Sequence, residues 1–244
     1  RHYRKQSLRF KRFHIEKCPI FLLINCGVWD VMSPGAHRLL SGRYSMAFVH
    51  LHNHSHYSVL DGAIPVDKMV KRAVELGMNA VALTDHGNMC GAIEFYEAAN
   101  KNGIKPIIGQ EFYMAPGSRF NKETRSGEDT NYHFLLVAKN EEGYKNLMRL
   151  SSIGYNEGFY YKPRIDMESL EKHLGGLIAG SACLGGEIPQ LILKKKFDEA
   201  RKVAGRFKDM FGKDHFYLEL QDHGIPEQKT VNEELVRMSS ELDI

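Results

Sequence analysis

Hydrophobic and polar positions change their spacing along the chain, and each change predicts a new element of secondary structure. Residues 1–46 show no clear period and begin without methionine, whereas regular alternation starts at Met46. We interpret Met46 as a candidate natural start and residues 1–46 as upstream sequence with no role in the fold. Residues 47–244 are then expected to form one domain.

Beyond Met46 the spacing switches between the two-residue period of a strand and the 3.6-residue period of a helix. The predicted strands cover residues 48–54, 80–84, 106–113, 133–138, 176–181 and 215–220. The predicted helices cover residues 65–76, 90–102, 141–155, 188–195, 197–211 and 227–242. Gly77 and Gly103 follow helical patterns as left-handed C′ residues do, and Asn140 is a candidate N-cap.

The order of these elements predicts the architecture. Strands that alternate with helices favour parallel pairing through right-handed crossovers, in an open doubly wound sheet or in a closed β/α barrel. A polar stretch over residues 116–131 predicts a loop between the third and fourth strands. Polar residues fall near the ends of the first five strands, and such groups can converge only if the sheet closes. We therefore expect an α/β barrel.

Charge sets limits on nucleic-acid binding. The chain carries +3 overall, but its first 46 residues hold nine lysines and arginines against Glu16 and Asp30, a net +7, so that the remainder carries −4. A slightly acidic domain offers no electrostatic surface for gripping a phosphate backbone. Any nucleic-acid role is therefore expected to come from a specific site or from other parts of a longer protein.

Cysteine spacing and hydropathy set limits on the compartment. Cys18, Cys26, Cys90 and Cys183 are irregularly spaced, which fits a reducing, cytoplasmic setting better than a disulfide framework. The longest apolar run, residues 19–28, is much shorter than the roughly 20 residues that span a bilayer. We expect no membrane association.

The first predicted strand carries an unusual cluster of histidines. Period-2 spacing puts His50, His52, His54 and His56 on one face, whereas Val49 and Leu51 lie on the other. A lone histidine is more often a hydrogen-bonded core or surface residue than a ligand. Four together favour metal binding, because neutral imidazole is a common ligand and two in an H-x-H pattern can bind one ion.

Further candidates follow the later strands. Glu111 comes after Ile107, Ile108 and Gly109, where a buried carboxylate is costly unless it is paired or coordinates a cation, so it is the strongest bridging candidate. Asp61 is either a turn residue before Gly62 or a bridging carboxylate. The other candidates are Asp85, which is alternatively a helix cap, His86 after the second strand, His133 and Cys183.

The last two of these rank lower on the residues alone. His133 opens its strand, the wrong end for a site at carboxyl ends, and a free cysteine such as Cys183 is usually a small buried hydrophobe. A mixed set of nitrogen, oxygen and one sulfur donor suits Zn, Mn or Fe better than Mg or Ca. Two or more such ions about 4 Å apart can activate water and stabilise a departing alkoxide, which is phosphoester hydrolysis.

Several strings in the sequence resemble a known family. HLHNHSHYSVLDG over residues 50–62, LTDHGNMCGAIEFY over 83–96 and KPIIGQE over 105–111 resemble the polymerase and histidinol phosphatase (PHP) domain. GFYYKPRID over 158–166 and GSACLGGEI over 180–188 are similar to the branch found in the amino-terminal part of the bacterial replicative DNA polymerase III alpha subunit. The resemblance covers about residues 46–244.

This resemblance implies a distorted seven-stranded β/α barrel of the TIM type, with a trinuclear site for two or three divalent ions, Zn or Mn. It is associated with 3′-5′ exonuclease proofreading in some members and is degenerate in others. The implied ligands are His52, His54, Asp61, His86, Glu111, His133 and Cys183, which leaves His50 and His56 outside the set. The family's further Asp-x-His motif would lie beyond Ile244, so that the chain is expected to stop before the last strand.

Three functional hypotheses follow. The first is that the chain is the PHP domain of a replicative polymerase. That parent protein copies DNA with partners such as the sliding clamp and a proofreading subunit. The second is a freestanding phosphatase of histidinol phosphatase type, which the string YYKPR over residues 160–164 disfavours. The third is a binding module in which the metals only stabilise the fold and the domain binds a separate proofreading subunit.

Overall fold

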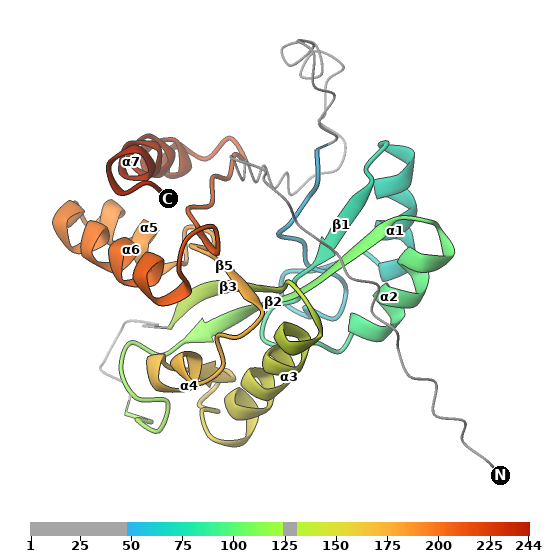
Figure 1. Cartoon of the computed structure of the whole chain (residues 1–244), viewed down its shortest axis with the longest axis horizontal. Coiled ribbons are helices and arrows are strands. Elements are labelled where there is room, and N and C mark those ends of the chain that lie inside the picture. Colours follow the sequence, from blue (N-terminus) through green and yellow to red (C-terminus); the bar gives the residue numbers. More distant parts are fainter. Residues whose placement is uncertain (1–47, 124–130) are drawn as a thin grey trace.

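A computed structural model describes residues 48–123 and 131–244 (Figure 1). The predictions for residues 1–46, and the part of the predicted loop over 124–130, lie outside the described residues. The strands are β1 (Ala80–Leu83), β2 (Lys105–Met114), β3 (Tyr132–Ala138), β4 (Arg164–Ile165), β5 (Leu177–Gly180) and β6 (Phe216–Tyr217). The helices are α1 (Val66–Glu75), α2 (Ala92–Lys101), α3 (Glu141–Asn156), α4 (Met167–Glu171), α5 (Glu187–Leu193), α6 (Phe197–Phe211) and α7 (Pro226–Leu242).

The six predicted helices are confirmed, and the three residues predicted to mark helix ends behave as expected. The Asn140 side chain accepts a hydrogen bond from the Gly143 backbone N–H, as an N-cap does. Gly77 and Gly103 adopt positive φ angles of 74° and 70° directly after α1 and α2. β4 and α4 were not predicted, because a two-residue strand and a five-residue helix are too short to show a period.

The pairing of the strands corrects the prediction of a wholly parallel sheet. β1 pairs with β2 in parallel, as do β2 with β4 and β5 with β6, but β3 runs antiparallel to both β2 and β5. The connection from β2 to β3 contains no predicted helix, and a parallel pairing needs a crossover, usually helical. The polar loop over residues 116–131 was therefore a signal for a reversed strand that the alternation argument overlooked.

The sheet is also not closed among the described residues. Its order is β1-β2-β3-β5-β6, with β4 paired to β2 off this path. The fold is therefore a mixed α/β fold with a six-stranded sheet, and the closed seven-stranded barrel remains a prediction.

The predicted strand over residues 48–54 is not regular, although it runs beside β1. The backbone N–H groups of Ala82 and Thr84 donate to the carbonyls of His50 and Asn53. The Asn53 side chain also donates to the carbonyls of His50 and Ala82, and its backbone N–H donates to the Thr84 hydroxyl. Side-chain groups thus take places that a regular ladder gives to the backbone.

Two hydrophobic clusters cover the sheet. One joins α1 and α2 to β1 through side chains such as Met69, Phe95 and Val81. The larger one joins α3, α5, α6 and α7 to β2, β3 and β5, and Figure 1 shows α1 and α2 beside β1 and α5 to α7 grouped beyond β5. No helix among residues 48–123 and 131–244 is long and apolar enough to cross a membrane. Because these helices pack against the faces of the sheet, the ends of the strands can carry polar groups.

Candidate metal centre

Polar side chains from five segments meet at one edge of the sheet. Glu111 lies within β2, and His86 follows β1 in a parallel bridge with it. His133 lies opposite Tyr113 in the β2–β3 register, two positions from the pair of Glu111 with Leu135. Because β3 is reversed, its beginning lies at the same edge as the carboxyl ends of its neighbours. This explains how a residue at the apparently wrong end of its strand reaches the cluster.

The Glu111 carboxylate is the centre of the cluster. Its Oε2 lies 2.9 Å from His54 Nε2, 3.3 Å from His52 Nε2 and 3.6 Å from His86 Nδ1. Its Oε1 lies 3.0 Å from His133 Nδ1. Glu111 and His52 are almost fully buried, with side-chain exposures of 1% and 2%. One buried carboxylate therefore faces four imidazoles.

Asp61 forms a second, more open contact at the rim. Its Oδ2 lies 2.9 Å from His86 Nδ1 and 3.2 Å from His54 Nδ1. The side chain of Asp61 is 42% exposed and that of His133 is 23% exposed. The cluster therefore grades from a closed end at His52 to an open end at Asp61.

Cys183 stands at the margin of the cluster. Its Sγ lies 3.3 Å from His133 Nδ1 and 3.6 Å from Glu111 Oε1. The turn after β5 that delivers it holds Ala182 at a φ of 62°, a strained angle for a residue with a Cβ. Burial, followed by the nearby charge of Glu111, raises the pKa of the thiol well above its usual range.

The charges of the cluster depend on one another. Burial alone raises the pKa of Glu111 and lowers that of His52, but their mutual contact and those with neighbouring groups reverse both shifts. The pKa of Glu111 is held well below, and that of His52 well above, the ordinary value. Burial likewise lowers the pKa of His54, yet contacts with Asp61 and Glu111 outweigh it and raise the pKa to about 9. Protons on the histidines thus supply positive charge beside Glu111 that a bound cation could supply instead.

The donor set fits divalent metal ions. Three groups of three residues bring one ligand atom each within 4.8 Å of one another: His52 with His54 and Glu111, His54 with Asp61 and His86, and His86 with Glu111 and His133. The Nε2 atoms of His54 and His86 are buried without a hydrogen bond among the described residues, although His54 Nε2 lies close to Glu111. Buried nitrogen donors without a partner are costly, and coordination would satisfy them.

The remaining histidines of the first segment lie apart from these groups. His50 is buried and packs edge-on to Phe48, and its backbone carbonyl accepts a hydrogen bond from the Ala82 N–H. His56 is exposed and packs on Tyr57. The structure therefore brings together six of the seven predicted ligands in the three groups, with Cys183 beside them.

Asp85 is neither in the three groups nor a helix cap. Its carboxylate accepts from the Ser55 backbone N–H and from the hydroxyls of Ser55 and Ser58. Helix α2 begins only at Ala92, and Gly91, not Asp85, occupies its N-cap position. The cap interpretation was wrong, and Asp85 instead fixes the turn that leads from His54 to Asp61.

The sequence reasoning missed Glu219. It follows β6, its side chain is fully buried, and its Oε1 lies 2.6 Å from His52 Nδ1. The signal was present, because a carboxylate after the apolar residues Phe216 and Leu218 repeats the pattern that singled out Glu111. The predicted strand over 215–220 also placed it at a carboxyl end.

The sequence profile described as "PHP domain" matches residues 50–223, most of the chain and every candidate described above. The chain belongs to the PHP domain family. This PHP domain is 55% identical over 197 residues to the DNA polymerase III subunit alpha of Borreliella burgdorferi, covering 81% of this chain and 17% of that protein. The proteins of the same name from Aquifex aeolicus and Thermus aquaticus are 48% and 49% identical, covering 82% and 78% of this chain and 18% and 16% of theirs.

The PHP domain thus spans less than a fifth of the length of these relatives. Among solved structures, a protein from Bifidobacterium adolescentis, named provisionally as a metal-dependent phosphoesterase, superposes with a TM-score of 0.46. It shares 14% sequence identity, and the match covers 80% of this chain and 84% of that one.

Proposed function

We propose that this chain is the PHP domain of a bacterial replicative DNA polymerase III alpha subunit and that its site hydrolyses phosphoesters with bound metal ions. The identity of 48–55% to proteins of that name supports the polymerase hypothesis over a freestanding phosphatase. On this proposal the parent protein is a DNA-directed DNA polymerase, with DNA and other replicase subunits as its partners. A cytoplasmic location and a domain spanning residues 47–244 belong to the same proposal.

The observation that carries the proposal is the position of Glu111. A carboxylate that is 1% exposed and faces four imidazoles is suited to bridge cations, because each of its oxygens lies near a different set of nitrogens. Exposed acidic clusters are common without metal, but a buried bridging carboxylate is costly unless it is compensated. The three overlapping groups support two or three ions.

We assign the proposed ligands to seven residues: His52, His54, Asp61, His86, Glu111, His133 and Cys183. The high proportion of nitrogen donors favours Zn or Mn. When bound, such ions would supply a water of lowered pKa and positive charge for the phosphate oxygens. Glu111 belongs to two of the three ligand groups and joins them, and Asp61 restrains the imidazoles of His54 and His86 at the open end.

The surroundings of the open end fit an anionic substrate. Lys162 Nζ lies 4.7 Å from the centroid of the Tyr113 ring, and that ring stacks on His86 at 4.2 Å. A cation beside the stacked rings of Tyr113 and His86 would attract phosphate in a domain that is otherwise slightly acidic. Proofreading of 3′ ends, a 3′-5′ exonuclease activity, is the form of phosphoester hydrolysis that best suits a replicative polymerase.

The test measures metal content and cleavage of 5′-labelled single-stranded DNA together. The 244-residue chain, and a chain extended beyond Ile244 to include the expected Asp-x-His motif and last strand, are each loaded with Zn or Mn. His52→Ala and Glu111→Ala variants are compared with His56→Ala, a matched histidine change at an exposed position. We expect metal-dependent shortening from the 3′ end that the first two variants lose and His56→Ala keeps.

The outcomes separate the hypotheses. Bound metal without cleavage in either chain would contradict the nuclease and favour a metal-stapled domain that docks a proofreading subunit. Cleavage of histidinol phosphate but not of DNA would favour the freestanding phosphatase. Cleavage that survives Glu111→Ala would show that the activity arises elsewhere.

A further inference from the structure

Glu219 is a buried carboxylate whose position is not explained by the seven proposed ligands. It lies on the segment after β6, and its Oε1 is 2.6 Å from Nδ1 of His52. The other ring nitrogen of His52, Nε2, lies 3.3 Å from Glu111 Oε2. The imidazole of His52 is thus held between two carboxylates, one central to the proposed metal site and one behind it.

A chain of polar contacts holds Glu219 in place. Its backbone N–H donates to the Ser181 hydroxyl, and Gln221 Nε2 donates to Glu219 Oε1 at 2.5 Å. Helix α7 supports Gln221 in turn, because Asn232 Nδ2 donates to its backbone carbonyl at 2.8 Å and Gln228 Nε2 reaches its side-chain oxygen at 3.5 Å. The carboxylate therefore has a fixed direction before any ligand binds.

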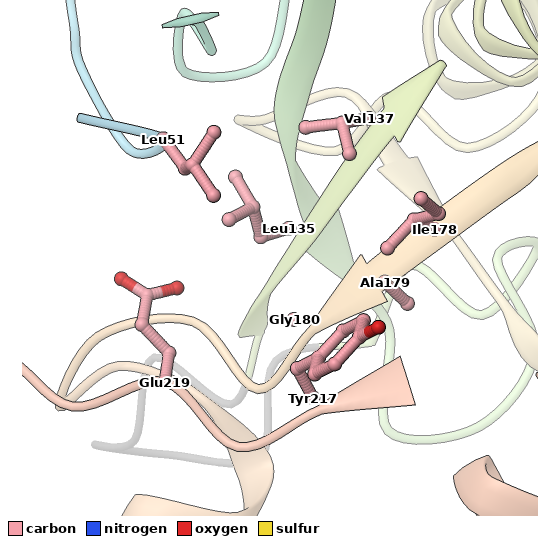
Figure 2. A pocket seen from close by; sticks show the side chains of 8 residues that line it. All are labelled: Leu51, Leu135, Val137, Ile178, Ala179, Gly180, Tyr217 and Glu219. Atoms are coloured by element: carbon pink, nitrogen blue, oxygen red, sulfur yellow. The ribbon is translucent and has the colours of Figure 1, made fainter. Parts of the chain in front are cut away.

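The other side of the carboxylate faces apolar surroundings. In Figure 2 it points toward Leu51, in a cavity of about 20 Å³ that is also lined by Leu135, Val137 and Ile178. Glu219 Oε2 is buried there and has no hydrogen-bond partner in the part of the chain that the structure describes. A half-satisfied carboxylate in such a place costs stability, so that packing alone gives no reason for an acidic residue here.

We propose that Glu219 is a positioning residue: it holds a proton on Nδ1 of His52 and fixes the ring, so that Nε2 is presented to the Glu111 side as a ligand. Metal-binding histidines commonly donate their second ring N–H to a carboxylate, which sets the tautomer and raises the basicity of the coordinating nitrogen. The inference rests on the proposed metal site and deepens it, because it names the residue that orients the most buried of the proposed histidine ligands.

The first measurement is the affinity for Zn²⁺ alone, by competition with a chromophoric chelator, in the full chain. We expect Glu219→Leu to weaken the affinity by about 10- to 100-fold, the usual effect of losing such a carboxylate. Glu219→Gln keeps the size and an acceptor oxygen, and we expect it to recover most of that loss. Glu234→Gln is the matched control, because Glu234 is also buried but pairs with Arg201 of α6 and Arg237 of α7.

The second measurement needs no metal. Nitrogen-15 NMR of the metal-free chain follows the Nδ1 proton of His52, which a short hydrogen bond shifts downfield and protects from exchange. We expect this signal in the wild type and in Glu219→Gln and expect it to be absent in Glu219→Leu.

Three results would overturn the inference. They are an affinity of Glu219→Leu within twofold of the wild type, an equal loss in the Glu234→Gln control, and an Nδ1 signal that persists in Glu219→Leu. Failure of the proposed function gives a different result, in which the wild type binds Zn²⁺ weakly or cleaves no DNA while the Nδ1 signal still depends on Glu219.

Discussion

The two ends of the proposed metal centre differ in burial, and this difference predicts different roles for them. At the closed end, His52 and Glu111 are almost fully buried, and Glu219 contacts His52. At the open end, the side chain of Asp61 is 42% exposed and lies against His54 and His86. Charges at the closed end are strongly coupled, whereas water screens those at the rim. We expect the closed end to govern metal retention and stability, and the open end to govern contact with substrate.

The largest effect should come from Glu111→Ala. Removing this carboxylate deprives four imidazoles of their common partner, and breaking a buried charged network costs about 3 kcal/mol or more. We expect the free energy of unfolding in denaturant titrations to fall by about that amount, and any DNA cleavage to fall at least ~1,000-fold. Glu75→Ala, an exposed carboxylate on α1, is the control and should change neither. An unchanged metal content in Glu111→Ala would contradict the proposal that the closed end governs metal retention.

The second prediction concerns pH and the metal-free chain. The folded pKa of His54 is about 9, above the 6.5 of the unfolded chain, so its stabilisation is complete below pH 6.5 and is lost as pH rises through 9. The shift corresponds to a loss on the order of 3 kcal/mol, and His52 acts in the same direction. We expect the Tm in chelator to fall between pH 6.5 and 10.

Metal should reverse this trend, because ligands bind only after losing their protons, so that metal-dependent stabilisation grows as pH rises. A His54→Gln variant should show a smaller fall in Tm without metal. Equal slopes in the variant and the wild type would contradict the role of His54 in this pH dependence.

The third prediction concerns the open end. Asp61→Ala removes a carboxylate that is 42% exposed, so that the free energy of unfolding should change by no more than about 1 kcal/mol. The proposed cleavage should still fall by about 10- to 100-fold, since His54 and His86 lose the group that restrains them. Thermal melts and initial rates measured on one preparation test this contrast. A loss of stability as large as that of Glu111→Ala would erase the distinction between the ends.

The smallest predicted effect belongs to Lys162→Met, beside the open end. Loss of the cation should raise KM for DNA by about three- to tenfold and leave kcat and metal content unchanged, because Lys162 lies over the Tyr113 ring and is not itself a proposed ligand. Lys71→Met, on α1, is the matched control. A fall in kcat with an unchanged KM would place Lys162 in catalysis and not in substrate attraction.

Patterns within single segments predicted the helices well, because each helix shows its own period. α6 was predicted at its observed bounds, and Asn140 caps α3 as expected. The direction of β3 was missed, because pairing depends on how distant segments meet and not on the strand's own pattern. That error explains why the residues alone ranked His133 low, and only the family resemblance raised it.

The site shows the same division. Glu111 stood out because a carboxylate after an apolar run is costly to bury, and the structure buries it among imidazoles. Glu219 carried a similar local signal but was overlooked, since its importance depends on His52, which lies 167 positions away in the sequence. Asp85 resembled a helix cap locally, yet its carboxylate contacts Ser55 and Ser58.

The separation of His52 and Glu219 also bears on the order in which the protein folds. Pairing of β2 with β3 joins neighbouring segments and can form early, but the contact of His52 with Glu219 closes a loop of 167 residues and must wait for long-range assembly. During synthesis, residues 50–111 emerge from the ribosome well before Glu219. The closed end of the metal centre is therefore completed late in folding, and tight metal binding would report that this chain has finished folding.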